Sequence, residues 1–264
     1  MTSTATWLSM TTSRRVVGIR LGAEVRHQSV LLARDPGPMI GYVVMAMLLI
    51  TVTRPMYDAL GHFVPGLPPF GIDQAAAGMA VMFSLFALKV VGAHMLNERT
   101  WNTWDRLRAT PAGFGEILFG KALPLYGAIV VQQAVLFGFS AVVFGLHPKS
   151  GWWVLALCGL CWSAWVLLLG TASSTLARSP AQLSAGGDMF AMLTTILGGA
   201  LVPVLLLPVW LRHLAPISPG YWAMQAYRAA LLASPRALVR PLAMLGVFGM
   251  IGVALAAVIG RVQR

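Results

Sequence analysis

Six apolar blocks, each close to the length that crosses a bilayer as a helix, follow one another along the chain. They cover roughly residues 37–53, 75–96, 118–146, 152–176, 189–207 and 238–260. About 20 mainly apolar residues in helical conformation span the hydrocarbon core of a membrane. The pattern therefore predicts an all-α integral membrane protein with six transmembrane helices.

Prolines interrupt the apolar run that follows the fifth block, at positions 208, 216, 219 and 235. Proline removes a backbone donor and breaks a regular helix. Irregular backbone within a membrane is tolerated only where protein or a watery cavity surrounds it. We therefore expect a re-entrant broken helix at about residues 208–234, before the last span.

The residues before the first block follow a different pattern. Over residues 13–34, apolar side chains recur on one side of a helix and basic side chains on another, as in a helix that lies in the membrane interface. The apolar positions are Val17, Leu21, Val25 and Leu32, and the basic positions are Arg20, His27 and Arg34. The sequence DPGP at 35–38 then breaks this helix. We expect residues 1–36 to form a cytoplasmic N-terminal region and residues 37–264 the membrane domain.

The composition agrees with a membrane protein. Hydrophobic residues make up 58% of the chain and charged residues 10%, against about 25% charged residues in soluble domains. The formal net charge of +11 would suit nucleic acid in a soluble protein, but in a membrane protein basic residues mark the cytoplasmic side. With both termini in the cytoplasm, twelve lysines and arginines lie on that side and six on the other. We therefore expect cytoplasmic termini, contact with membrane lipid and no nucleic-acid partner.

A polar segment at residues 97–121 separates the second and third blocks. It holds seven of the chain's twenty-seven charged residues, whereas the blocks beside it are nearly uncharged. Asn102, with Asp105 three places on, and the pair Thr110-Pro111 are typical starts of short helices. A solvated loop would explain the charges alone. A charged helical segment between two spans also suits contact with a soluble partner.

Motifs for catalysis or cofactor binding fit poorly. Gly115 to Lys121 reads GEILFGK, like the start of a phosphate-binding loop, but Ala122 replaces the Ser or Thr that would hold magnesium. Cys158 and Cys161 form a lone C-x-x-C pair in mid-block, which favours helix packing over metal or redox chemistry. We expect this chain to bind no cofactor, nucleotide or metal and to have no catalytic residue. We expect Lys121 to extend toward the lipid headgroups.

Two ionisable residues lie within apolar blocks. Lys89 is near the cytoplasmic end of the second block, where its long stem can carry the ammonium to the interface. Asp188 is at the start of the fifth block, where it can cap the helix. A cavity-facing role is the alternative for Lys89. Methionine and phenylalanine side chains of these two blocks are candidates to line an adaptable apolar pathway, among them Met79, Phe83 and Met192.

The whole arrangement resembles the type-2 ABC exporter permeases, particularly the small permeases of drug-resistance exporters. The most specific part of the resemblance is a residue pattern similar to E-R-E-x-G-T…E-x-L…T-P in that family. It consists here of Glu98-Arg99, Thr103, Asp105-Arg106-Leu107 and Thr110-Pro111. Thr100 and Asn102 stand where the family usually has Glu and Gly.

The resemblance implies a role for each of these segments. Residues 97–111 would be the coupling helix that docks on a separate ABC ATPase, through Glu98, Arg99, Thr103, Asp105, Arg106, Leu107, Thr110 and Pro111. Two ATPase subunits, which bind ATP and magnesium, would serve two permeases in a bacterial cytoplasmic membrane, either two copies of this chain or one copy and a sibling. Trp210, Tyr221 and Trp222 of the re-entrant segment would close the outer end of the path. The cargo would be a lipophilic drug-like molecule or a lipid.

Other functions fit parts of the same pattern. A proton-coupled secondary transporter would use Lys89 and Asp188 as titrating groups and would need no ATPase. A polysaccharide or glycolipid exporter permease would share the topology and carry a different cargo. An intramembrane enzyme is disfavoured, because the five histidines are scattered singly and no G-x-S-x-G or H-E-x-x-H motif occurs.

Overall fold

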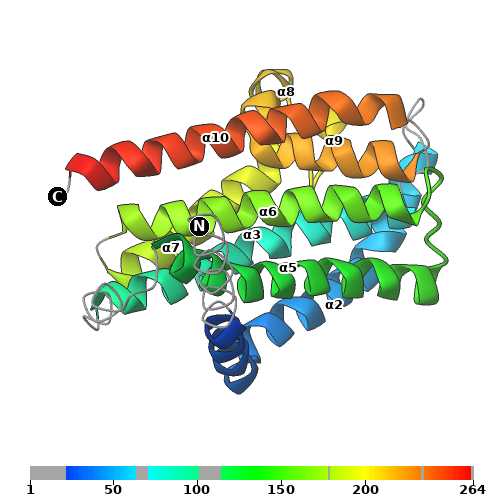
Figure 1. Ribbon diagram of the computed structural model, residues 1–264. Helices are drawn as coiled ribbons and strands as arrows, with labels where there is room; N and C mark the ends of the chain where they lie inside the picture. Colours follow the sequence, from blue (N-terminus) through cyan, green and yellow to red (C-terminus); the bar gives the residue numbers. More distant parts are fainter. Residues whose placement is uncertain (1–21, 64–70, 101–113, 178, 233–234, 263–264) are drawn as a thin grey trace, which may run out of the picture.

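The computed structural model describes residues 22–63, 71–100, 114–177, 179–232 and 235–262. Within those ranges every regular element is a helix. The long helices lie side by side in one bundle, and most of them run along a common direction (Figure 1). The all-α prediction is confirmed for this part of the chain.

Five helices in the described ranges are long and apolar enough to cross a membrane. They are α2 (Gly37–Phe63), α3 (Gly71–Thr100), α5 (Phe114–Phe144), α6 (Trp152–Leu176) and α10 (Val239–Val262). The fourth predicted block, residues 152–176, has the same bounds as α6. Helix α2 runs past the predicted end at residue 53 and contains Pro55, because a single proline near a helix end removes only one hydrogen bond.

Helix α7 (Pro180–Leu197) replaces the predicted fifth span at residues 189–207 and lies nearer the N-terminus. Ser179 caps its start by accepting a hydrogen bond from the backbone nitrogen of Gln182 at 3.2 Å, and Pro180 takes the first helical position. Its end is followed by Gly199, whose φ of 73° suits glycine. Helix α7 is not among the five apolar helices, so a sixth span stays a prediction.

The predicted broken segment is a series of short helical pieces. They are η1 (Val204–Leu206), α8 (Val209–Leu214), η2 (Ala215–Ile217) and α9 (Pro219–Leu231), followed by η3 (Pro235–Leu238) before α10. Pro208 directly precedes α8 and Pro219 begins α9, which agrees with prolines as helix breakers and starters. Helix α9 is mostly buried, whereas α8 has no buried residue. The re-entrant course through the bilayer stays a prediction.

Helix α3 is the centre of the bundle and packs against α2, α5, α6, α7 and α9. Its N-terminal half is rich in small residues that allow close approach of neighbouring backbones, including the buried Ala75, Ala76, Ala77 and Ala80. A Cβ atom at Gly78 would collide with the carbonyl oxygen of Ala200, in the turn after α7. The core therefore depends on glycine and alanine at this contact.

Polar side chains inside the bundle are paired across helices. Trp162 of α6 donates its indole N–H to Ser84 Oγ of α3 at 2.6 Å. Gln133 of α5 donates to the carbonyl oxygen of Ala80 at 3.1 Å and accepts from the Tyr227 hydroxyl of α9 at 3.2 Å. In a low-dielectric interior such bonds position the helices and satisfy groups that would otherwise be costly to bury.

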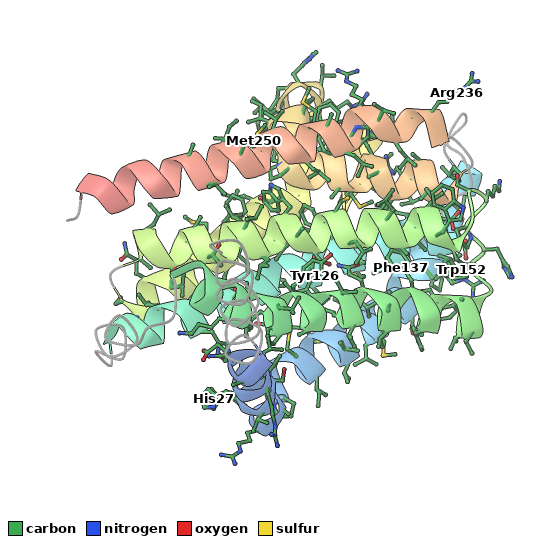
Figure 2. The ribbon with its side chains drawn as sticks, viewed as in Figure 1. His27, Tyr126, Phe137, Trp152, Arg236 and Met250 are labelled. Atoms are coloured by element: carbon green, nitrogen blue, oxygen red, sulfur yellow. The ribbon has the colours of Figure 1, made fainter. Side chains whose placement is uncertain are left out.

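The hairpin predicted between the third and fourth spans is present as α5 and α6, joined by residues 145–151. Backbone nitrogens of Lys149 and Ser150 donate to the carbonyl oxygens of Leu231 and Ala230, which anchors the end of α9 to this loop. Trp152 and Arg236 lie at this same end of the bundle (Figure 2). Exposed tryptophan together with arginine is typical of a membrane–water interface.

The N-terminal helix covers residues 22–34 of the described chain and is followed by the predicted break at 35–36. It lies across the direction of the long helices, as an interfacial helix would (Figure 1). His27 projects from it, away from the bundle (Figure 2). The predicted start of this helix, residues 13–21, lies outside the described residues.

Candidate functional site

An ion pair lies inside the apolar part of the bundle. Lys89 Nζ of α3 is 2.7 Å from Asp188 Oδ1 and 3.0 Å from Oδ2, so the ammonium bonds both carboxylate oxygens. Asp188 stands in the middle of α7, and the prediction that it caps a helix start is therefore wrong. The head group of Lys89 contacts Asp188, and its extension to the membrane interface stays a prediction. Each residue alone would cost about 2.5–3.5 kcal/mol at a bilayer centre, and the pairing offsets part of this.

Aromatic side chains surround the ammonium. The ring of Phe86 lies 6.0 Å from Lys89 Nζ, and the hydroxyl of Tyr42 on α2 is a further hydrogen-bonding neighbour. The rings of Tyr42 and Phe86 are stacked with centroids 6.3 Å apart, and Phe83 meets Phe86 edge to face at 5.9 Å. Three helices, α2, α3 and α7, therefore meet at Lys89.

The pair is only partly covered by the protein. The side chain of Lys89 is 27% exposed and that of Asp188 is 43% exposed. On either side of it, the outward faces of α2 and α7 are apolar and exposed, with Met45 at 53% and Met192 at 44%. The ion pair is therefore a polar site beside exposed apolar side chains of two candidate membrane-level helices.

A second polar cluster joins the N-terminal end of α3 to the C-terminal end of α9. Gln74 Nε2 donates to the carbonyl oxygens of Gly199 and Ala200 at 2.9 and 3.2 Å, and its Oε1 accepts from Arg228 Nη2 at 2.8 Å. The Tyr57 hydroxyl of α2 donates to the carbonyl oxygen of Leu201 at 2.6 Å. The turn between α7 and η1 is thus held by side chains from two other helices.

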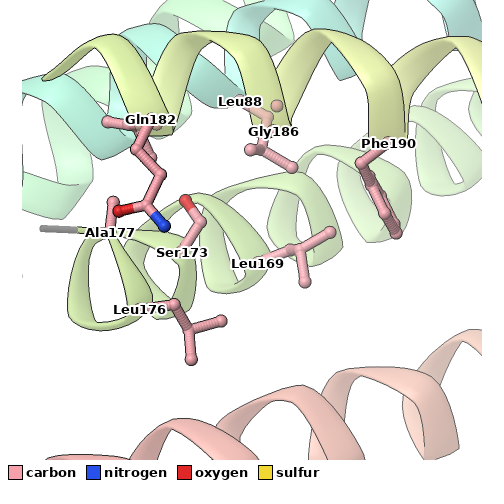
Figure 3. Close-up of a pocket in the computed structure, with 10 residues that line it drawn as sticks. Leu88, Leu169, Ser173, Leu176, Ala177, Gln182, Gly186 and Phe190 are labelled. Atoms are coloured by element: carbon pink, nitrogen blue, oxygen red, sulfur yellow. The ribbon is translucent and has the colours of Figure 1, made fainter. Parts of the chain in front are cut away.

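An apolar groove of about 350 Å³ lies between α6 and α7. Ser173 and Gln182 lie at the end near the α6–α7 connection, and Phe190 lies at the other end (Figure 3). Leu88 of α3 also lines it, one residue before Lys89. Gly187, beside Asp188 in the chain, also lines the groove, and a Cβ atom built on it would lie 3.5 Å from the Cβ of Lys89.

The residues predicted for the pathway occupy different environments. Met79 and Phe83 are buried in the core at 0% and 5% exposure, and Trp222 is buried at 6%. Met192 and Trp210 are exposed at 44% and 64%, and Tyr221 is half-buried. Trp222 donates to the carbonyl oxygen of Pro216 at 2.8 Å, and Arg240 lies 5.4 Å from its ring. A role of these side chains in a path or gate stays a prediction, and in this conformation Met79 and Phe83 have packing roles.

The predicted coupling segment is described only at its start. Glu98 and Arg99 lie in the last turn of α3, which continues past the end of the second apolar block at residue 96 to Thr100. The other predicted coupling residues lie outside the described residues, namely Thr103, Asp105, Arg106, Leu107, Thr110 and Pro111.

The candidate phosphate-binding sequence is helical from Phe114 onward, within α5, so it has no loop to cradle a phosphate. Lys121 is only 4% exposed, which contradicts its predicted extension to the headgroups. Cys158 packs with its Sγ 3.6 Å from the carbonyl oxygen of Ala226 on α9, as expected for a packing residue. Among the described residues, no group of three His, Cys, Asp or Glu side chains could hold a metal ion.

Sequence reasoning missed Gln74 and the contribution of Tyr42. Both residues lie in apolar blocks or beside their ends. A single amide or phenol side chain there carries no sequence signal that distinguishes it from other polar residues. Arg228 lies 154 residues from the glutamine that it contacts, so no local pattern marks the pair. The only available signal was the presence of a basic residue in an apolar segment.

Comparison with known proteins identifies the family. The model of the ABC-2 type transporter family matches residues 21–232. The Linearmycin resistance permease protein LnrN of Bacillus subtilis (strain 168) is 25% identical over 149 residues, which are 56% of this chain and 38% of that protein. The Probable multidrug ABC transporter permease YbhR of Escherichia coli (strain K12) is 25% identical over 146 residues, 53% of this chain and 38% of that protein. The chain therefore matches less than half the length of these curated relatives. Because the family model covers most of the chain, the protein belongs to the ABC-2 type transporter family of membrane permeases.

Proposed function

We propose that this protein is the transmembrane subunit of an ATP-driven exporter that moves a lipophilic drug-like molecule or lipid out across the bacterial cytoplasmic membrane. The family match over residues 21–232 carries the proposal. Five apolar helices, with α3 at the centre of the bundle, support a role within the membrane, and the names of the two relatives support an apolar cargo of the drug or antibiotic type.

The energy for transport would come from a partner. We infer that two ABC ATPase subunits bind ATP and magnesium and dock on residues 97–111 of two permeases, which are two copies of this chain or one copy and a sibling. The charge density of this segment supports the inference, together with its position directly after the last turn of α3. Both termini would lie in the cytoplasm, on the ATPase side.

The docking assignment can be tested by charge reversal. The permease is expressed with its ATPase, and the complex is purified from cells that carry Glu98→Lys with Asp105→Lys. We expect binding of the ATPase to fall at least about tenfold, because lost charged contacts at an interface typically cost more than about 1.4 kcal/mol. Asp35→Lys is the matched control, since Asp35 is an exposed carboxylate at the junction before α2.

Normal ATPase binding and normal export in the double variant would contradict the docking assignment. Loss of binding in the Asp35→Lys control as well would show that the assay reports charge in general. Export in sealed vesicles that contain the permease and its ATPase, with and without ATP, tests the energy source separately.

A proton-coupled secondary transporter is the second candidate, and one observation favours it. Lys89 and Asp188 form a partly exposed ion pair within the apolar bundle, and such residues can serve as proton carriers. This candidate predicts transport by the permease alone under an imposed pH gradient. This candidate would be excluded if transport required ATP and the partner subunit and did not depend on the pH gradient.

A further inference from the structure

The surface around Lys89 and Asp188 is unsuited to lipid tails. An ionisable group within a membrane normally faces the bundle interior or a water-filled cavity, and it pairs with another polar group. Here the two side chains are paired and still 27% and 43% exposed. The face that contains them, formed by α2, α3 and α7, therefore has polar surface with which it can bind a polar group in the assembled transporter.

We propose that this face binds the polar group of an amphipathic cargo, and that the cargo's polar group is an uncharged hydrogen-bond donor such as a hydroxyl or an amide N–H. This proposal rests on the proposed function, because it names the cargo chemistry of the same transporter. The ion pair would bind the polar group, and the neighbouring side chains of Tyr42, Phe86, Met45 and Met192 would contact the apolar body.

The hydrogen-bonding capacity of the pair favours a donor. An ammonium has three donors, and two of those of Lys89 are used on the two oxygens of Asp188, with the Tyr42 hydroxyl close to the same group. A carboxylate has about four acceptor positions, and Lys89 uses only one on each oxygen. The carboxylate is also the more exposed partner. The remaining capacity of this site is therefore mainly that of an acceptor.

The charge of the pair favours an uncharged ligand. Lys89 and Asp188 neutralise each other, so a charged ligand would bring an uncompensated charge into a region of low dielectric constant. A cation would also be repelled by the ammonium of Lys89, and an anion by Asp188. A hydroxyl or amide donates to Asp188 without adding charge.

The apolar surroundings favour an amphipathic molecule over a small polar solute. Phe86 and Tyr42 are stacked at 6.3 Å beside the pair, and Met45 and Met192 are exposed on the adjoining faces of α2 and α7. Methionine side chains adapt to ligands of different shapes. One polar anchor beside a flexible apolar wall is the usual composition of a site for drug-sized ligands.

The test uses three photoreactive probes with the same diazirine-bearing dodecyl chain and different heads: dodecyl glucoside, dodecyltrimethylammonium and dodecyl sulfate. The purified full chain is placed in phosphatidylcholine nanodiscs and irradiated with each probe below its solubilising concentration. Labelled peptides are quantified by mass spectrometry. We expect the glucoside to label peptides of α2, α3 and α7 most strongly, and the two charged probes about tenfold less.

The decisive variant is Lys89→Met with Asp188→Leu, which removes both charges together and leaves neither unpaired. We expect glucoside labelling of these peptides to fall about tenfold. Met189→Leu is the matched control, because Met189 is the exposed apolar neighbour of Asp188 and the change keeps its volume. The temperature at which the buried Cys158 thiol becomes reactive on heating shows whether each variant is folded.

Lys89→Arg provides a second test that keeps the ion pair and avoids a folding defect. A guanidinium has five donors in place of three, so it takes more of the carboxylate's acceptor positions and leaves donors of its own unused. We expect this variant to label less with the glucoside and more with the sulfate probe.

Equal labelling by the three probes, or glucoside labelling that is unchanged in the double variant, would overturn the proposal. Efficient disulfide formation between two copies through Met45→Cys, with no probe labelling of this face, would also overturn it, since a second copy would then cover the pair. ATP-driven export is measured in parallel with the partner ATPase. Absence of export with selective labelling intact counts against the proposed function alone, and export with unselective labelling counts against this site alone.

Discussion

Replacing Gln74 by leucine tests whether one side chain holds the N-terminal end of α3 to the C-terminal end of α9. Gln74 is 1% exposed and takes part in three hydrogen bonds. Two are donated to the carbonyl oxygens of Gly199 and Ala200, and one is accepted from Arg228. Leucine has a similar volume and no polar atom, so Gln74→Leu removes all three bonds without opening a large cavity.

The expected loss of stability follows from the three bonds. Hydrogen bonds between membrane helices average about 0.6 kcal/mol, which gives about 1 kcal/mol for the two bonds to carbonyl oxygens. A hydrogen bond to a charged group contributes about 1.5–3 kcal/mol, and the buried guanidinium of Arg228 supplies the third. The sum is about 3–4 kcal/mol. At about 2–4 °C per kcal/mol for a chain of this size, the melting temperature should fall by about 10 °C.

The two native cysteines provide the assay. Cys158 is buried and Cys161 is partly buried, so a thiol-reactive dye reports their exposure as the protein unfolds on heating. Gln132→Leu is the matched control, because both polar atoms of the Gln132 side chain are buried and have no hydrogen-bond partner among the described residues. Gln132→Leu should therefore leave the melting temperature unchanged or raise it.

The reasoning would be refuted if Gln74→Leu melted within about 2 °C of the natural protein, or if Gln132→Leu lost as much stability as Gln74→Leu. Gln74→Glu separates the two kinds of bond. It keeps an acceptor for Arg228 and loses the donors to the two carbonyl oxygens, so its melting temperature should lie between those of the natural protein and Gln74→Leu.

Three further predictions use the same dye assay or thiol labelling. Gly78→Ala should destabilise the protein by about 1–3 kcal/mol, because the added Cβ meets the turn after α7. Gly127→Ala is the control and should leave the stability unchanged, because a Cβ there has open space around it. Equal melting temperatures of the two variants would contradict the contact at Gly78. The single variant Lys89→Met should lower the stability of the protein more than the double variant Lys89→Met with Asp188→Leu, because the single change leaves a carboxylate unpaired. A larger loss of stability in the double variant would contradict the pairing. In a protein without the two native cysteines, a cysteine placed at Lys149 should react with a membrane-impermeant maleimide added outside cells. A cysteine added at either terminus should not react. The opposite labelling would show that the predicted orientation in the membrane is wrong.

The sequence predicts the uninterrupted apolar helices well. The fourth block has the bounds of α6, because Gly151 directly before it and the polar residues after it are local signals of its ends. The short link to α5 makes an antiparallel hairpin the only possible arrangement. The break at residues 35–36 and the prolines around α8 and α9 were predictable for the same reason, since proline acts on its own neighbours.

The start of α7 was not predictable from hydrophobicity. A count of apolar residues treats Asp188 as the edge of a block, whereas in the structure Lys89 neutralises it in mid-helix. The two residues are 99 positions apart, and no local pattern indicates their pairing. The burial of Lys121 was missed in the same way, because a long side chain beside a span suits extension or burial equally well until its neighbours are known. Lys89 and Asp188 were therefore recognisable singly from the sequence, and only the fold shows that they pair.

The position of α3 explains how events in the cytoplasm can act on the outer end of the bundle in the proposed transport cycle. Its last turn holds Glu98 and adjoins the segment assigned to the ATPase, and Gln74 lies about 36 Å away along the same helix. Helix α3 contains no proline and is buried along most of its apolar length, so it has no obvious point at which to bend. It is also bound to α7 through Asp188 and to the turn after α7 through the carbonyl oxygen of Gly199. In that proposed cycle, a displacement passed to the last turn of α3 would move α3 and α7 together and would reach α9 through Gln74, as a rigid-body shift of helices instead of a local unfolding.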